Sequence, residues 1–166
     1  RRLGQFYAGL YEELSLYVRQ SAWLNTAPER PAHDKSTDRQ LSRLEKLRAD
    51  RNDSEFNPQM PDVNAYYLIS YLFEIGPIQT TGMGTSPITY AEIQTWMNLV
   101  GLDLQPWEIR FLKKLSCDYL NESHMAEKSD RPPAWDQQKW VQEQRNAISN
   151  RVQNALRARM IKKRSV

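Results

Sequence analysis

The segment from Thr89 to Leu120 constrains the fold more than any other part of the chain. Thr89-Tyr90-Ala91-Glu92 is the pattern of a capping box, in which the threonine side chain accepts from a backbone N–H and the glutamate reaches back. The helix that follows is expected to stop at Gly101, and Pro106 suits the first turn of another helix. The stripes expected to be buried are Ile93, Trp96, Met97 and Val100 in the first helix and Trp107, Phe111, Leu112, Leu115, Tyr119 and Leu120 in the second. Two helices joined by so short a link must pack as a helical hairpin or corner.

Helical periodicity extends over most of the remaining chain. It predicts four further helices, at residues 3–24, 37–51, 63–75 and 135–163. Asp62 is the expected N-cap of helix 63–75, which is apolar on most faces and is therefore expected at the centre of the core, and Gly76 ends it. The segments between the helices are predicted as loops or linkers, at residues 25–36, 52–62, 76–87 and 121–134. No strand-like alternation of convincing length is present, so the expected fold is all-α, a compact domain of about five helices followed by a long C-terminal helix.

Length and charge divide this expected domain into three regions. A chain of 166 residues is long enough for one domain with an appended helix. We expect an N-terminal helical region at 1–61, a central helical core at 62–123 and a long basic helix at 134–166. After Glu143 there is no acidic residue, whereas the preceding part has 16 basic and 20 acidic residues, a net charge of −4. The basic residues of this end are Arg145, Arg151, Arg157, Arg159, Lys162, Lys163 and Arg164.

The basic end has two interpretations that the sequence leaves open. Arg151, Arg157, Arg159, Lys162, Lys163 and Arg164 are the candidates for a basic surface that meets nucleic acid or an acidic protein. Alternatively, these cations are solvated and suit the negative end of the helix dipole. The longest apolar stretch, residues 65–73, is far shorter than the roughly 20 residues of a membrane span. We see no secretion signal, and a lone Cys117 fits a reducing compartment.

The residues that commonly carry catalysis or bind metal are too sparse to predict an active site. His33 lies in a proline-broken loop, and Glu122 and His124 point to different faces of a helix. Cys117 and His124 are seven residues apart, roughly 10 Å along one helix, which exceeds hydrogen-bond reach. Gly82-Met83-Gly84 lacks the rest of a phosphate-binding motif. We therefore expect no catalytic residue, no metal and no cofactor.

A helix-turn-helix that binds DNA is the first binding hypothesis for residues 89–120. Arg110, Lys113 and Lys114 are expected on the outer face of its second helix. The link between the two helices is longer than usual for this motif, however. Glu108 also lies early in that helix, where DNA phosphates would repel it. The sequence therefore disfavours this hypothesis.

A resemblance gives a more specific hypothesis. It is carried by Pro87-Ile88-Thr89-Tyr90-Ala91-Glu92-Ile93-Gln94-Thr95-Trp96, Leu99-Val100-Gly101, Leu104-Gln105-Pro106-Trp107-Glu108, Leu112–Leu115 and Asp118-Tyr119-Leu120. Residues 63–123, including the Gly-rich segment before Pro87, resemble the tail assembly chaperones of tailed bacteriophages. The resemblance implies a helical, non-enzymatic protein of the host cytoplasm that keeps apolar tape-measure helices soluble and helps recruit tail-tube subunits.

The residues expected to bind such a partner are Trp96, Met97, Trp107 and Phe111. Trp can anchor a partner helix in a groove, and Met adapts to irregular surfaces. The competing interpretation is that this stripe is ordinary core. The alternative function is a structural component of the virion, such as a tail or head–tail connector subunit, which would be found in purified particles. Under either function the chain could form oligomers.

Overall fold

The computed structural model describes residues 2–30, 37–82 and 84–136, together with residues 138, 142, 145, 146, 148, 149, 152 and 153. Arg1–Ala134 form one compact unit and Trp135–Val166 a second, and each is described by itself. The helices of the first unit are α1 (Arg2–Asn25), α2 (Arg43–Arg51), α3 (Tyr66–Ile75), α4 (Tyr90–Val100) and α5 (Pro106–Ala126). A β-hairpin, β1 (Ile78–Thr81) and β2 (Gly84–Pro87), lies between α3 and α4.

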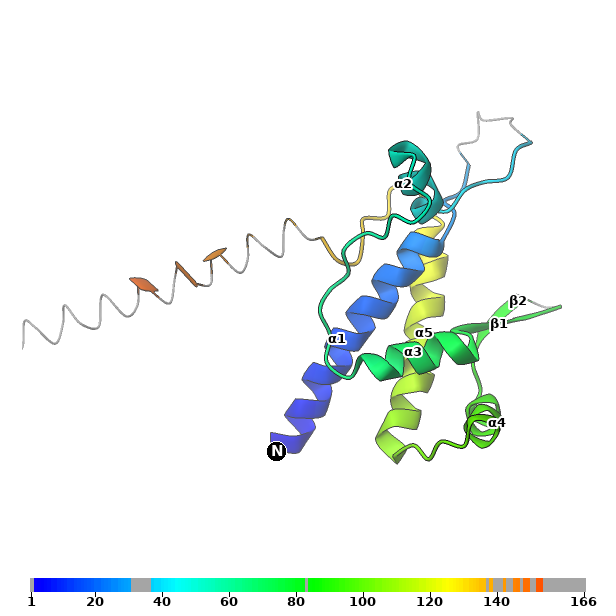
Figure 1. The fold of residues 1–166 in the computed structure, drawn as a ribbon, viewed down its shortest axis with the longest axis vertical. Coiled ribbons are helices and arrows are strands. Elements are labelled where there is room, and N and C mark those ends of the chain that lie inside the picture. Colours follow the sequence, from blue (N-terminus) through cyan, green and yellow to red (C-terminus); the bar gives the residue numbers. More distant parts are fainter. Residues whose placement is uncertain are drawn as a thin grey trace, which may run out of the picture. The chain divides into compact units, whose positions relative to one another are not determined.

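Helix α5 is the centre of the first unit. It packs along α1, which runs in the same direction, and it also contacts α3, α4 and both strands (Figure 1). The fully buried side chains include Leu14 and Val18 of α1, and Leu112 and Leu115 of α5. The core contains Leu10, Leu14, Val18, Ala22, Leu68, Ile69, Leu72, Ile88, Ile93, Trp96, Met97, Leu104, Phe111, Leu112, Leu115 and Tyr119.

The expectation that residues 63–75 form the central helix is wrong. Helix α3 buries one face, with Leu68 and Leu72 at 0% exposure, while Tyr66, Tyr67 and Phe73 remain exposed. It lies against α5 and α1 at the edge of the unit. Tyrosine tolerates such a position because its ring is apolar and its hydroxyl is polar.

Local signals at the helix ends are largely confirmed. Thr89 and Glu92 form the predicted capping box, and Gly101 ends α4 in the left-handed conformation with φ +70°. Pro106 lies in the first turn of α5 as expected. In Figure 1, α4 is seen nearly end-on while α5 runs upward in the plane of the view, so the two helices form a corner.

Other helix ends differ from the prediction. Asp62 is not the cap of α3, because the helix starts at Tyr66 after Ala65, whose φ is +55°. Helix α2 starts later than predicted, after the capping box of Ser42 and Glu45. Helix α5 continues to Ala126, so the segment after it begins at Glu127, six residues later than the predicted start at Asn121.

The expectation of an all-α fold is wrong for residues 78–87, which form the antiparallel hairpin β1–β2. Its register pairs Ile78 with Pro87 and Thr81 with Gly84. The base of the hairpin is fixed by buried Ser116 of α5, whose Oγ accepts from Ile88 N over 2.9 Å and donates to Pro77 O over 2.7 Å. Lys113 Nζ donates to Ile88 O over 2.8 Å. These tertiary bonds stabilise a hairpin too short to be independently stable in water.

In the second unit, the described residues between 138 and 153 are helical, in agreement with the predicted helix at 135–163. Gln142 Nε2 donates to Asn146 Oδ1 over 3.0 Å, and Ile148 and Val152 are exposed. The six basic-surface candidates, Arg151, Arg157, Arg159, Lys162, Lys163 and Arg164, lie outside the described residues. Among the described helices, none combines the length and apolar character that a bilayer crossing requires.

Candidate binding surface

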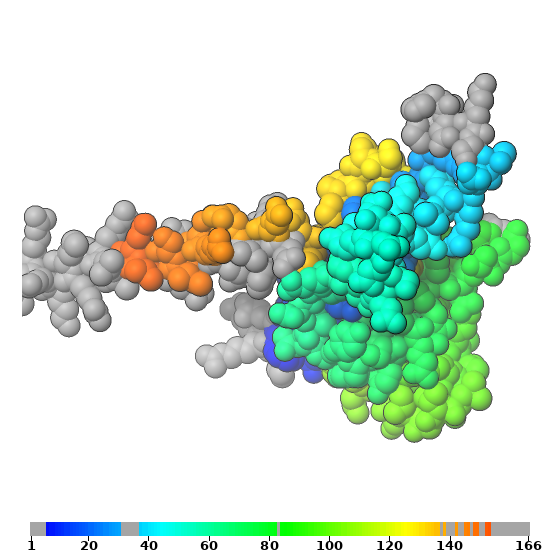
Figure 2. Space-filling view, turned by 45° about the horizontal axis from the view of Figure 1, so that its top comes forward, coloured from blue at the N-terminus to red at the C-terminus, as the bar shows by residue number. Residues whose placement is uncertain are grey.

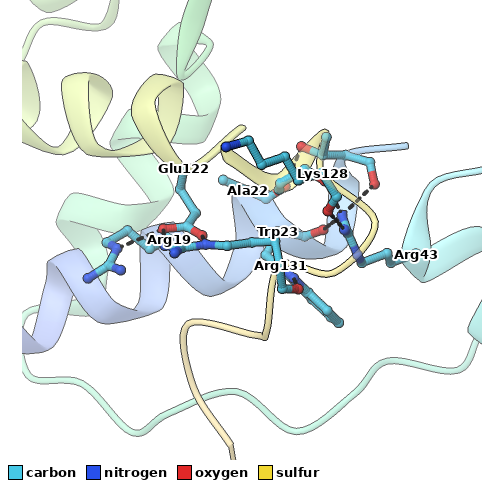
Figure 3. Close-up of polar contacts among 9 residues, drawn as sticks. Arg19, Ala22, Trp23, Arg43, Glu122, Lys128 and Arg131 are labelled. Carbon is cyan, nitrogen blue, oxygen red and sulfur yellow. Dashed lines mark hydrogen bonds and ion pairs between the residues drawn. The ribbon is translucent and has the colours of Figure 1, made fainter. Parts of the chain in front are cut away.

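A buried carboxylate connects α1, α5 and the segment after α5. Glu122 has no exposed surface, and Arg19 Nε donates to its Oε2 over 3.0 Å. Arg131 donates to both carboxylate oxygens, over 2.9 and 3.0 Å (Figure 3). Burial opposes the charge of Glu122, but the two arginines outweigh it and hold the pKa of this carboxyl below its usual value. The chain after α5 is thereby fixed back against α1.

Arg43 closes the C-terminal end of α5. Its guanidinium donates to Ala126 O over 2.7 Å and to Lys128 O over 2.9 Å, and it stacks over the ring of Trp23 at 4.7 Å (Figure 3). Burial lowers the pKa of Arg43. Trp23 Nε1 donates to Arg131 O over 2.9 Å. The charged groups of this cluster bond to one another or to backbone, so we interpret it as a structural clasp of α1, α2 and α5.

The opposite ends of α1 and α5 are joined by aromatic rings. Tyr7 of α1 packs on Trp107 at 5.1 Å between ring centroids, and Trp107 packs edge-on to Phe111 at 5.3 Å. Tyr11 contacts Phe111 at 5.3 Å, and its hydroxyl donates to Asp118 Oδ2. Burial and this carboxylate raise the pKa of Tyr11. Trp107 and Phe111 therefore hold α1 onto α5.

A second series of rings links α3 to α4. Tyr67 contacts Tyr71 at 5.5 Å, and Tyr71 contacts Trp96 at 5.0 Å. The hydroxyl of Tyr67 donates to Glu108 Oε1 over 2.5 Å, and burial and this bond raise the pKa of Tyr67. Trp96 Nε1 is the buried side-chain donor that lacks a hydrogen-bond partner in the described part of the chain. These contacts join α3 to the middle of α4 through Tyr71 and Trp96, and to the first turn of α5 through Tyr67 and Glu108.

The exposed apolar side chains of α3 and α4 are called here the α3–α4 surface. It comprises Tyr66, Tyr67, Phe73, Tyr90, Leu99 and Val100. Leu99 has 81% of its surface exposed, which leaves a large aliphatic side chain in water. Figure 2 shows green α3 and yellow-green α4 side chains lying at the molecular surface. Exposed apolar side chains are candidates for contact with a protein partner, and Leu99 is the most exposed of these six.

The structure places most of the sequence-predicted partner residues inside the unit. Trp96, Met97 and Phe111 are buried in the core, and Trp107 is half-buried. Val100, expected in the buried stripe, is instead exposed. Sequence reasoning missed the exposed Leu99, although its position outside the apolar stripe of α4 was a signal for exposure.

The described residues contain no group of three or more His, Cys, Asp or Glu side chains that could hold a metal ion. His124 Nε2 lies 3.3 Å from Thr85 Oγ1, and Ser15 Oγ donates to Asp118 Oδ2 over 2.7 Å. Lys113, expected to face outward in a helix-turn-helix, donates to Ile88 O. That bond fixes the hairpin and does not present the lysine for phosphate contact.

A comparison with known families finds a match in the central segment. Residues 42–121 match the phage tail assembly chaperone family. This chaperone-family segment covers α2, α3, the hairpin, α4 and most of α5, and it confirms the resemblance predicted for residues 63–123. No curated protein and no solved structure matches the chain.

The chaperone-family segment does not contain the whole core. Leu14, Val18 and Ala22 of α1 are fully buried, although α1 precedes the matched residues. Arg19 also comes from α1, whereas its partner Glu122 follows the match by one residue. In this chain, α1 therefore covers a face of the matched segment, where Tyr7 packs on Trp107 and Tyr11 on Phe111 of α5.

Proposed function

We propose that the chain is a non-enzymatic chaperone that binds apolar helical segments of phage tail proteins on the α3–α4 surface. The family match of residues 42–121 is the observation that supports this proposal most directly. The tape-measure protein is the proposed client, and tail-tube subunits are a second class of partner. The chaperone would act in the host during virion assembly.

The α3–α4 surface has the chemistry that this role requires. An amphipathic client helix presents apolar residues along one face, and these need an apolar counterpart to be kept out of water. Leu99 and Val100 provide aliphatic contacts, and Tyr66 provides a ring that tolerates both water and an apolar neighbour. Trp96 and Met97 lie on the buried face of the same helix, where they support α4. We therefore assign the direct contacts to the exposed side chains and the support to the buried stripe.

Co-expression with the tape-measure protein of the same phage tests the proposal. The wild-type chain should keep the tape-measure protein soluble and co-purify with it. Leu99→Glu should abolish this effect, because it places a charge on the apolar surface while leaving the core intact. Gln94→Glu is the matched control, since it adds the same charge at an exposed position of α4. Equal loss in both variants, or no binding by the wild type, would contradict the proposal.

Retention in the virion is the competing role. Mass spectrometry of purified particles distinguishes the two, because a connector or tail subunit is present in stoichiometric amounts and an assembly chaperone is nearly absent. Nucleic-acid binding by the proposed basic surface of residues 151–164 is tested separately, by measuring the affinity for duplex DNA at increasing salt concentrations. Phosphate contacts predict a steep loss of affinity as salt rises.

A further inference from the structure

The hairpin has one strand whose outer edge is available. Strand β2 approaches α5, where Thr85 lies beside His124, and it ends at Pro87, which has no backbone N–H to donate. Among the described helices and strands, β1 contacts only β2 and α5. Thr80 and Thr81 of β1 are exposed, and no proline interrupts the strand. The edge of β1 that faces away from β2 is therefore suited to pair with another strand.

This edge lacks the charges that normally protect exposed strands. From Ile75 to Ala91 the chain has no Asp, Glu, Lys or Arg, although charged residues make up 26% of the whole sequence. This interval is the longest uncharged one in the chain. Natural edge strands are commonly blunted by lysine, by inward-pointing charges or by proline, because an unprotected edge is a template for further pairing. The hairpin combines an open edge with the absence of charged residues.

We propose that β1 pairs with β1 of a second copy of this chain, antiparallel about a twofold axis, to form a four-stranded sheet. In such a symmetric pairing, each residue near the axis faces its own kind or a close neighbour. A charged residue there would repel its own copy, so an uncharged edge rich in threonine is what self-pairing requires. Opposed threonines stabilise antiparallel pairs. The family match does not predict this contact, and it is independent of client binding.

The size of the edge sets the strength of the dimer. Strand β1 has four residues, whereas a stable interface buries about 800 Å² on each partner. A single strand pair falls well short of that area. The bond of Ser116 to Pro77 O, directly before β1, and the bonds of Ser116 and Lys113 to Ile88 after β2 hold the hairpin in place before pairing, which lowers the cost of ordering β1. The dimer is therefore weak and depends on protein concentration.

Sedimentation velocity of the full chain over a wide concentration range tests this proposal. The wild type should shift from monomer to dimer as concentration rises. Thr80→Lys should weaken the dimer at least about fivefold, because like charges then lie close to one another across the strand pair. Gln94→Lys adds the same charge to the exposed part of α4 and should leave dimerisation unchanged. Thermal melting of each variant confirms that the fold is intact.

A charge swap makes the test specific to the edge. A mixture of T80K and T80E chains should form heterodimers at low salt more readily than either variant forms homodimers. A wild-type chain that stays monomeric at every concentration would overturn the proposal. Dimerisation of T80K at wild-type strength, or equal weakening by Gln94→Lys, would overturn it as well. Client binding is measured separately, so its failure does not affect this result.

Discussion

Replacing Glu122 with glutamine should destabilise the first unit strongly, although the two side chains are nearly the same size. The carboxylate is fully buried and accepts hydrogen bonds from Arg19 and Arg131. The substitution removes the negative charge and replaces one acceptor with an NH₂ group, which cannot face a guanidinium. Removing one partner of a fully buried ion pair costs about 3–5 kcal/mol.

The expected cost is smaller here because the arginine side chains are 38% and 27% exposed and can regain water. We expect the free energy of unfolding to fall by about 2–3 kcal/mol, which lies between the cost of breaking a surface ion pair and that of breaking a fully buried one. For a protein of this size that corresponds to a melting temperature lower by about 4–12 °C. The measurement is chemical and thermal unfolding followed by circular dichroism.

The control is Arg39→Gln, which removes the exposed ion pair of Arg39 and Glu45 at 2.8 Å. Exposed pairs contribute about 0–1 kcal/mol, so this variant should unfold almost as the wild type does. Equal destabilisation by the two substitutions would refute the assignment of Glu122 as the charged centre of the clasp.

The pH dependence provides a second check on Glu122. Its pKa is lower in the folded chain than in the unfolded one, so its contribution to stability is present above the ordinary pKa of glutamate, about 4.3. The contribution is lost as the pH falls through the pKa that Glu122 has in the folded chain, because the wild-type carboxylate is then protonated and uncharged. The stability difference between wild type and Glu122→Gln should therefore narrow in acid. A constant difference would show that the charge is not its source.

Three further predictions follow from particular contacts. Ser116→Ala leaves the buried Ile88 N–H without its acceptor and should cost about 1–3 kcal/mol, with faster amide exchange in the hairpin. Arg43→Met removes the donor to Ala126 O and should increase proteolysis after α5; cleavage at the wild-type rate would count against the clasp. A chain ending at Pro133 retains α1 to α5 and should still melt cooperatively, whereas a broad transition would show that residues 134–166 are needed for the fold.

Local interactions explain which features could be predicted from the sequence. The capping box of Thr89 and Glu92 and the stop at Gly101 depend on backbone bonds within one helical turn. The stripe of Ile93, Trp96 and Met97 is buried as its period predicts. These features involve residues three or four positions apart, so a sequence window contains all of the partners. The family resemblance over the central segment rests on the same stretch of chain.

Only the tertiary structure decided which distant parts of the chain these helices pack against. Arg19 and Glu122 are 103 residues apart, and neither position has a local signal for a buried ion pair. Residues 78–87 form strands because Ser116, on a distant helix, fixes their base. Val100 follows the buried period but is the last residue of α4, and its side chain is exposed. Periodicity identifies the apolar face of a helix, whereas burial depends on whether another part of the chain packs against that face.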